Sequence, residues 1–191
     1  VDEQLGRKKL AMPAGEFLVG CFPVGEFEMN TEFPVAIDAE LLVIGYGNTL
    51  RGDDGVGPRV AETVEGLNLP GVRTLVGQQL SPEHAEPISR ARRVIFVDAA
   101  VDEKDGIKFR KLIPGDTTQL MAHAADPRTM LALARDVFGH APEAWLLTIP
   151  AEKLGFGAGF SLETEAGFHA AVAEIHRLQR DLPGCGQNKR A

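Results

Sequence analysis

The residues best suited to chemistry are three carboxylates and one histidine. Asp53 and Asp54 follow a glycine-containing turn, and Asp98 ends an apolar run. His123 lies in the loop before the next predicted helix. Carboxylate and imidazole groups together suit a divalent transition metal. The same groups could instead hold and polarise a water molecule for hydrolysis.

The elements that position these residues alternate between strand and helix patterns from Glu40 onward. This rhythm predicts an α/β fold with three layers, in which helices cover both faces of a mostly parallel central sheet. The continuous apolar run at 94–97 is typical of a central strand, whereas 107–112 alternates as a half-exposed edge strand does. We expect about five strands, at 41–44, 72–76, 94–97, 107–112 and 145–149. We expect helices at 56–67, at 81–89, from 126 onward, and in a long segment that ends before Pro183.

Ligands in such sheets bind outside the carboxyl ends of the strands. We expect the loops that carry Asp54, Asp98 and His123 to leave strand ends on the same side of the sheet. The candidate site therefore lies at that edge.

Each candidate residue also has an alternative interpretation. A carboxylate at a helix N-terminus can accept backbone N–H groups and complement the helix dipole, which we favour for Asp53 and leave open for Asp54. Asp98 could be a turn residue, but its place at the strand end favours a functional role. We interpret the other four histidines as solvated: His84, His140, His169 and His176.

Dinucleotide binding is the competing interpretation of the first turn. The stretch from Gly45 to Leu50 begins like G-x-G-x-x-G, but its third position is Leu50 rather than glycine. Asp53 and Asp54 would also put negative charge beside a pyrophosphate at the helix N-terminus. The turn therefore suits a cation better than a nucleotide, and we expect no organic cofactor.

Composition excludes several other classes of protein. The formal charge of −7 and the pI near 5.3 argue against nucleic acid as a partner. No apolar run approaches the ~20 residues of a membrane helix, so we expect no membrane partner. Cys21 and Cys185 lie near opposite ends and form no metal-type cluster, which favours a reducing cytoplasm.

The chain is expected to contain one folded domain. Residues 1–38 show little pattern and are interpreted as an N-terminal extension. The α/β domain is expected at 39–183, followed by a C-terminal tail at 184–191.

The turn motif resembles the signature of the nickel–iron hydrogenase maturation endopeptidases. Its residues are Gly45-x-Gly47-Asn48-x-Leu50-x-x-Asp53-Asp54-Gly55-x-Gly57. The segments Gln79–Glu83, Val94–Ala99, the surroundings of His123 and Ile149-Pro150 follow in the order of that family. The resemblance covers roughly residues 40–182.

The resemblance implies an α/β endopeptidase that removes a short C-terminal extension from a nickel-loaded hydrogenase large-subunit precursor. Asp54, Asp98 and His123 match the family's metal-contacting positions, and Asp54 and Asp98 are the candidate catalytic carboxylates. The nickel is expected to be supplied by the precursor rather than to be a resident cofactor. Asp54 is often a glutamate in the family, and His123 lacks a nearby hydroxyl residue that the family pattern would place there.

We therefore expect an aspartic-type or metal-dependent endopeptidase that acts as a cytoplasmic monomer. Two rivals remain at this point. One is a metal-recognition or chaperone module for hydrogenase assembly that binds the precursor without cutting it. The other is a nucleotide-binding oxidoreductase.

Overall fold

The computed structural model describes residues 37–115, 125–157 and 159–181, all within one compact unit, Phe33–Ala191. The strands are β1 (Leu41–Tyr46), β2 (Val72–Gly77), β3 (Arg93–Ala100), β4 (Lys108–Leu112) and β5 (Glu143–Pro150). The α-helices are α1 (Val56–Gly66), α2 (Ala85–Ser89), α3 (Pro127–Phe138) and α4 (Leu162–Arg180). Two short 3₁₀ helices, η1 (Gly52–Gly55) and η2 (Pro82–His84), precede α1 and α2. None of these helices is both long enough and apolar enough to cross a membrane.

The five strands form one sheet in the order β2-β1-β3-β5-β4. All neighbouring pairs are parallel except β4 and β5, which are antiparallel. The predicted mostly parallel sheet is confirmed, with β3 at its centre and β4 at its edge. The chain runs from β1 outward to β2 and then returns to β3 on the other side of β1. The boundary between β1 and β3 is therefore the topological switch point, where α/β sheets bind ligands.

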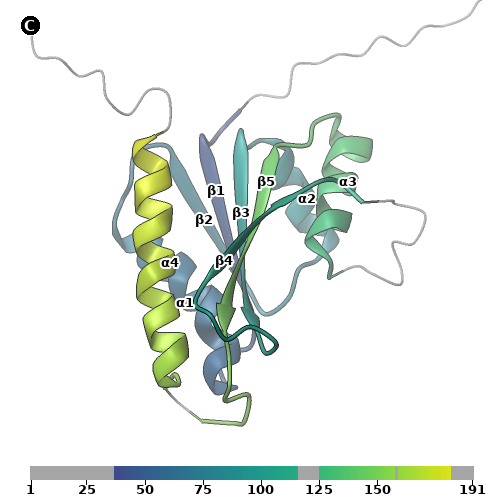
Figure 1. The fold of residues 1–191 in the computed structure, drawn as a ribbon. Helices are drawn as coiled ribbons and strands as arrows, with labels where there is room; N and C mark the ends of the chain where they lie inside the picture. The colour runs from purple at the N-terminus through teal and green to yellow at the C-terminus, as the bar shows by residue number, and fades with distance from the viewer. Residues whose placement is uncertain (1–36, 116–124, 158, 182–191) are drawn as a thin grey trace, which may run out of the picture. The chain divides into compact units, whose positions relative to one another are not determined.

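Helices cover both faces of the sheet (Figure 1). On one face α1 and α4 pack on Leu41, Val43, Ile95, Val97 and other buried residues. On the opposite face α2 and α3 pack on Leu42, Ile44, Val94, Phe96 and their neighbours. Because side chains alternate between the two faces along a strand, the even-numbered side chains of β1 and β3 lie on the α2/α3 face. Tyr46 and Asp98 belong to this even-numbered set.

Glycines allow α1 to lie directly against the carboxyl end of β1. A Cβ atom on Gly45 would stand 2.0 Å from the carbonyl oxygen of Gly57, and one on Gly57 would stand 2.5 Å from the carbonyl oxygens of Tyr46 and Val97. No side chain fits at these separations. Two glycines of the signature therefore fix how closely the helix start approaches the strand.

The loop after β4 does not leave the sheet as expected. Because β4 is antiparallel to β5, Leu112 lies opposite Ala144, near the start of β5. The segment that contains His123 therefore begins at the edge opposite the carboxyl ends of β1 and β3, so the expectation for this loop was wrong. The alternating pattern of 107–112 predicted a strand but carried no information about its direction.

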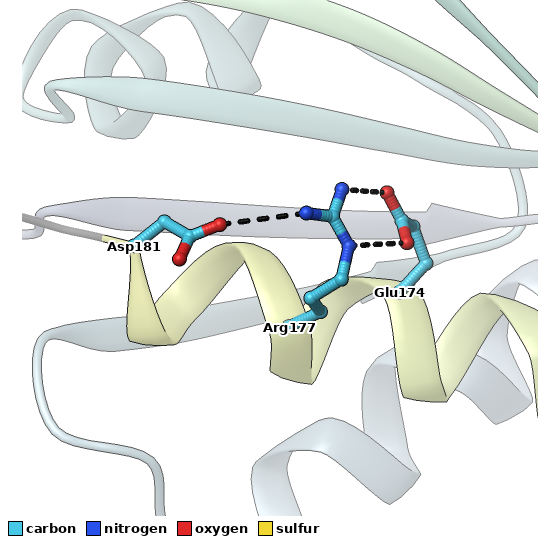
Figure 2. A network of polar contacts seen from close by, with 3 residues as sticks. All are labelled: Glu174, Arg177 and Asp181. Carbon is cyan, nitrogen blue, oxygen red and sulfur yellow. Dashed lines mark hydrogen bonds and ion pairs between the residues drawn. The ribbon is translucent and has the colours of Figure 1, made fainter.

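Both long helices after β4 begin with a side-chain cap. The carboxylate of Asp126 accepts the backbone N–H of Arg128 at 2.9 Å, and the hydroxyl of Ser161 accepts that of Thr164 at 3.3 Å. At the other end of α4, Arg177 donates to Glu174 at 2.6 and 2.9 Å and contacts Asp181 at 3.4 Å (Figure 2). These bonds raise the pKa of Arg177, and the position of this cation in the last turn complements the helix dipole.

Candidate functional site

The turn between β1 and η1 holds the carboxylate of Asp54. Gly47 has φ +141°, and a Cβ atom there would stand 2.0 Å from the carbonyl oxygen of Asp54, so only glycine fits. The chain folds back sharply at this point. As a result, the backbone N–H of Asn48 donates to Oδ2 of Asp54 at 3.1 Å, and Oδ1 of Asn48 accepts the N–H of Leu50 at 3.0 Å. Gly47 and Asn48 therefore shape the turn.

Asp98 lies in β3, two residues before the strand ends at Ala100, and beside the end of β1. The register pairs Gly45 with Val97, so Tyr46 and Asp98 are the next residues on the two strands and share the α2/α3 face. The Tyr46 hydroxyl donates a hydrogen bond to the Asp98 carboxylate. The backbone N–H of Ala99 also donates to Oδ1 of Asp98, at 2.8 Å.

Asp98 is held in an environment that favours its protonated form. Burial raises its pKa, and the charge of Asp54 raises it further, to about 6, against the opposing effect of the bonds from Tyr46 and Ala99. Burial and the neighbouring Asp98 likewise raise the pKa of the Tyr46 phenol, which stays protonated and can donate. The structure therefore brings Asp54 and Asp98 close enough to interact, and gives Asp98 a pKa near neutrality.

Asp53 has a different role from its neighbour. Its side chain is fully buried, and no side-chain cap is made to η1 or α1, so the interpretation of Asp53 as a helix cap is wrong. Its oxygens instead accept three backbone N–H groups across the fold, from Glu152 at 2.8 Å, Lys153 at 2.7 Å and Ser161 at 2.7 Å. Burial alone would raise the pKa of Asp53, but these bonds lower it to about 2.

Asp53 thereby joins the first turn to the loop between β5 and α4. The same two segments share backbone bonds, from Asp53 N–H to the Lys153 carbonyl at 2.9 Å and between Gly52 and Gly157 at 3.3 Å. Arg51 Nε adds a bond to the Leu154 carbonyl at 3.2 Å. Asp53 is therefore a structural support for the turn that presents Asp54.

His123 lies outside the described residues. Within the described ranges, no group of three or more His, Cys, Asp or Glu side chains is arranged to hold a metal ion. Asp126, the cap of α3, is close enough to contribute to the raised pKa of Tyr46. The N-terminus of α3 therefore lies on the side of the site that Tyr46 faces.

Tyr46 was not identified from the sequence as a residue of this site. Tyr46 follows Leu42 and Ile44 at the spacing of one sheet face, so its position beside a strand-end carboxylate could have been inferred from the parallel register. His84 was expected to be solvated, but it is half-buried and its Nδ1 accepts the backbone N–H of Ser81 at 3.1 Å in a capping box. Half-buried His140 likewise donates from Nδ1 to the Ser89 carbonyl at 2.8 Å.

The turn does not suit a nucleotide. The N–H of Asn48, one of the groups that could bind a phosphate at this turn, is occupied by the Asp54 carboxylate. The fold and this edge define an α/β protein with an acidic pair at the switch point of its sheet. The arrangement can exchange a proton near neutral pH and can attract a cation.

Known structures share this architecture. The chain is similar to a hydrogenase 2 maturation peptidase from a Thaumarchaeota archaeon, with 27% identity and a TM-score of 0.54 over 73% of this chain and 97% of that one. An endopeptidase from Escherichia coli gives 25% identity and a TM-score of 0.55, over 74% and 93% of the two chains. The hydrogenase maturating endopeptidase HybD from E. coli has 23% identity and a TM-score of 0.57. The match covers 74% of this chain and 93% of HybD, and it shows the shared fold.

Comparison of the sequence with protein-family models finds no match, and comparison with curated proteins finds none either. The structural similarity spans nearly the whole length of the peptidases and confirms the resemblance carried by the turn motif. The chain therefore resembles the hydrogenase maturation proteases in both its turn motif and its fold.

Proposed function

We propose that this protein is an endopeptidase that removes the C-terminal extension of a nickel-loaded hydrogenase large-subunit precursor. The observation that carries the proposal is the acidic pair at the switch point. Asp98 lies close enough to Asp54 for that charge to raise its pKa, on a fold shared with hydrogenase maturation peptidases.

Asp98 is the group suited to proton transfer. A carboxyl group with a pKa of about 6 can accept a proton from a water molecule and return it to the leaving amine near neutral pH. Burial in β3 supplies this property, and the phenol of Tyr46 donates a hydrogen bond that moderates it. Asp54, held by the Asn48 N–H, presents its second oxygen as a ligand or as a contact to the attacking water.

Nickel enters as part of the substrate. Asp54, Asp98 and His123 offer the oxygen and nitrogen ligands that such an ion accepts. His123 is proposed as the third ligand because it matches a metal-contacting position of the family that the turn motif resembles.

The partner is the precursor itself, and no organic cofactor is needed for hydrolysis. We place the reaction in the cytoplasm, in line with the scattered cysteines at 21 and 185, and expect the protein to act as a monomer.

The test compares nickel-loaded and nickel-free precursor, each incubated with the purified protein and weighed by mass spectrometry. Loss of a C-terminal fragment from the loaded form alone is the expected result. An unchanged mass for a folded, loaded precursor would refute the protease assignment. Equal cleavage of both forms would refute nickel recognition and leave proteolysis standing.

A further inference from the structure

A second polar cluster lies next to the acidic pair, formed by Glu103, Arg110 and Thr148. The Glu103 side chain is only 8% exposed, although it lies in the loop between β3 and β4. Its Oε1 accepts from Nη2 of Arg110, and its Oε2 accepts from the hydroxyl of Thr148. Nη2 of Arg110 also lies 3.4 Å from the Thr148 hydroxyl. Both oxygens of a buried carboxylate are therefore satisfied.

The register places this cluster one strand away from Asp98. Thr148 of β5 is the direct partner of Asp98 of β3, so their side chains leave the same face of the sheet about 5 Å apart. Arg110 of β4 pairs with Leu146, which belongs to the same α2/α3 face. A row of polar groups thus crosses the carboxyl end of the sheet: Tyr46, Asp98, Thr148 and the guanidinium of Arg110.

The buried and exposed parts of the cluster differ. Glu103 is withdrawn from solvent, whereas the Arg110 side chain is 57% exposed. A buried carboxylate costs free energy that an apolar residue would avoid. Here it holds an arginine at the protein surface through Nη2, which contacts both Glu103 and Thr148. A pre-oriented guanidinium beside a carboxylate pair is suited to bind an acceptor oxygen of a peptide.

We propose that Arg110 is a substrate-binding residue that takes an acceptor oxygen of the precursor chain, a backbone carbonyl or a side-chain carboxylate, next to the scissile bond. The inference rests on the proposed proteolysis. Glu103 and Thr148 act through Arg110 as positioning residues. A peptide that crosses the row from Asp98 past Thr148 meets the guanidinium one strand later.

Lys111 provides a matched control. It is the next residue of β4, has a 63% exposed side chain and pairs with Glu143 at 3.3 Å. It lies on the opposite face of the sheet, over the ring of Trp145. Arg110→Met and Lys111→Met therefore each remove one exposed cation from the same strand and break one ion pair, on different faces.

The experiment measures kcat and KM for cleavage of nickel-loaded precursor. Loss of a charged hydrogen bond to substrate is expected to raise KM about 10- to 100-fold in Arg110→Met, with kcat within about threefold of wild type. Lys111→Met is expected to keep both constants within about twofold. Arg110→Lys keeps a charge beside Glu103 and is expected to fold normally. Its KM is expected to lie between those of wild type and Arg110→Met, because lysine lacks the planar guanidinium group.

A binding measurement separates this role from a structural one. In the inactive Asp98→Asn background, Arg110→Met and Arg110→Lys should weaken the Kd for loaded precursor by the same factors as they raise KM. Thr148→Val and Glu103→Gln should weaken it less, because they act through Arg110. Equal Kd and KM values for the Arg110 variants and Lys111→Met would overturn the proposal. So would a change confined to kcat.

The source of the oxygen is resolved with a second precursor in which the acidic residues of the extension are replaced by amides. If Arg110 binds a carboxylate, Arg110→Met no longer raises KM with this precursor. If Arg110 binds a backbone carbonyl, Arg110→Met raises KM as before. If wild-type protein cleaves no loaded precursor, the proposed proteolysis is refuted. If wild-type protein cleaves the precursor and the Arg110 variants cleave it equally well, only the role of Arg110 is refuted.

Discussion

Asp53 and Asp98 lie at the same edge of the sheet but in opposite environments. Asp53 is fully buried and receives three backbone N–H groups, which lower its pKa to about 2. Asp98 is half-buried, receives fewer bonds and faces the charge of Asp54, so its pKa rises to about 6. Burial acts in the same direction on both carboxyl groups. The number of donors and the sign of the neighbouring charge decide whether a carboxylate supports the fold or remains available for proton transfer.

The largest expected effect concerns Asp98. Asp98→Asn keeps the size of the side chain but removes the group that can exchange a proton, so kcat for precursor cleavage should fall by about 10²- to 10⁴-fold. Mass spectrometry of loaded precursor over time measures the rate. Thermal unfolding provides the control, because the variant should remain folded. Retention of full kcat would show that Asp98 serves only as a contact to the precursor.

Asp53→Asn should instead act on stability. An amide has one acceptor oxygen, so it cannot satisfy the N–H groups that converge on both carboxylate oxygens of Asp53. We expect a loss of about 3 kcal/mol in the free energy of unfolding. Urea unfolding measures it, with Asp54→Asn as the matched control.

Asp54 accepts one backbone N–H at 3.1 Å and is only half-buried, so its variant should lose about 1 kcal/mol or less. Equal urea midpoints for the two variants would contradict the supporting role of Asp53.

Sequence patterns predicted the strand ends of this region but not its long-range bonds. Continuous apolar residues at 94–97 marked β3 as central, and the glycine turn marked the end of β1, so the meeting of Asp54 and Asp98 followed from parallel strand geometry. The donors to Asp53 lie 99 to 108 residues away, in a loop without regular periodicity. Local patterns cannot reveal such tertiary bonds. They also could not reveal the direction of β4, and hence the place of Arg110 beside Thr148.

The pH dependence of stability offers a smaller, two-sided test. The pKa of Asp53 is depressed, so its stabilising contribution is present above pH 4 and is lost as pH falls through about 2. The pKa of Asp98 is raised, so the contribution of its protonated form is present below about pH 4 and is lost as pH rises through about 6. Wild-type protein should therefore gain stability between pH 7.5 and 4.5, and lose it again near pH 2.

The Asp98→Asn variant tests whether Asp98 causes the change in stability between pH 7.5 and 4.5. Asp98→Asn should be more stable than wild type at pH 7.5, by about 3 kcal/mol at most, and this advantage should shrink as pH falls below 6. Urea unfolding across the pH range measures the difference. A constant difference between the two proteins from pH 7.5 to 4.5 would show that Asp98 titrates alike in the folded and unfolded states.

Tyr46→Phe should give the smallest effect and the finest test of how Asp98 is tuned. The phenol donates to the Asp98 carboxylate and so stabilises its charged form, which opposes the effect of burial. Removing that donor should raise the pKa of Asp98 further, and shift the acid limb of the kcat profile to higher pH by less than about one unit. At pH above 8 the rate should stay close to that of wild type, because Asp98 is then ionised in both proteins. A uniform loss of rate at every pH would instead mean that Tyr46 orients the carboxylate without setting its pKa.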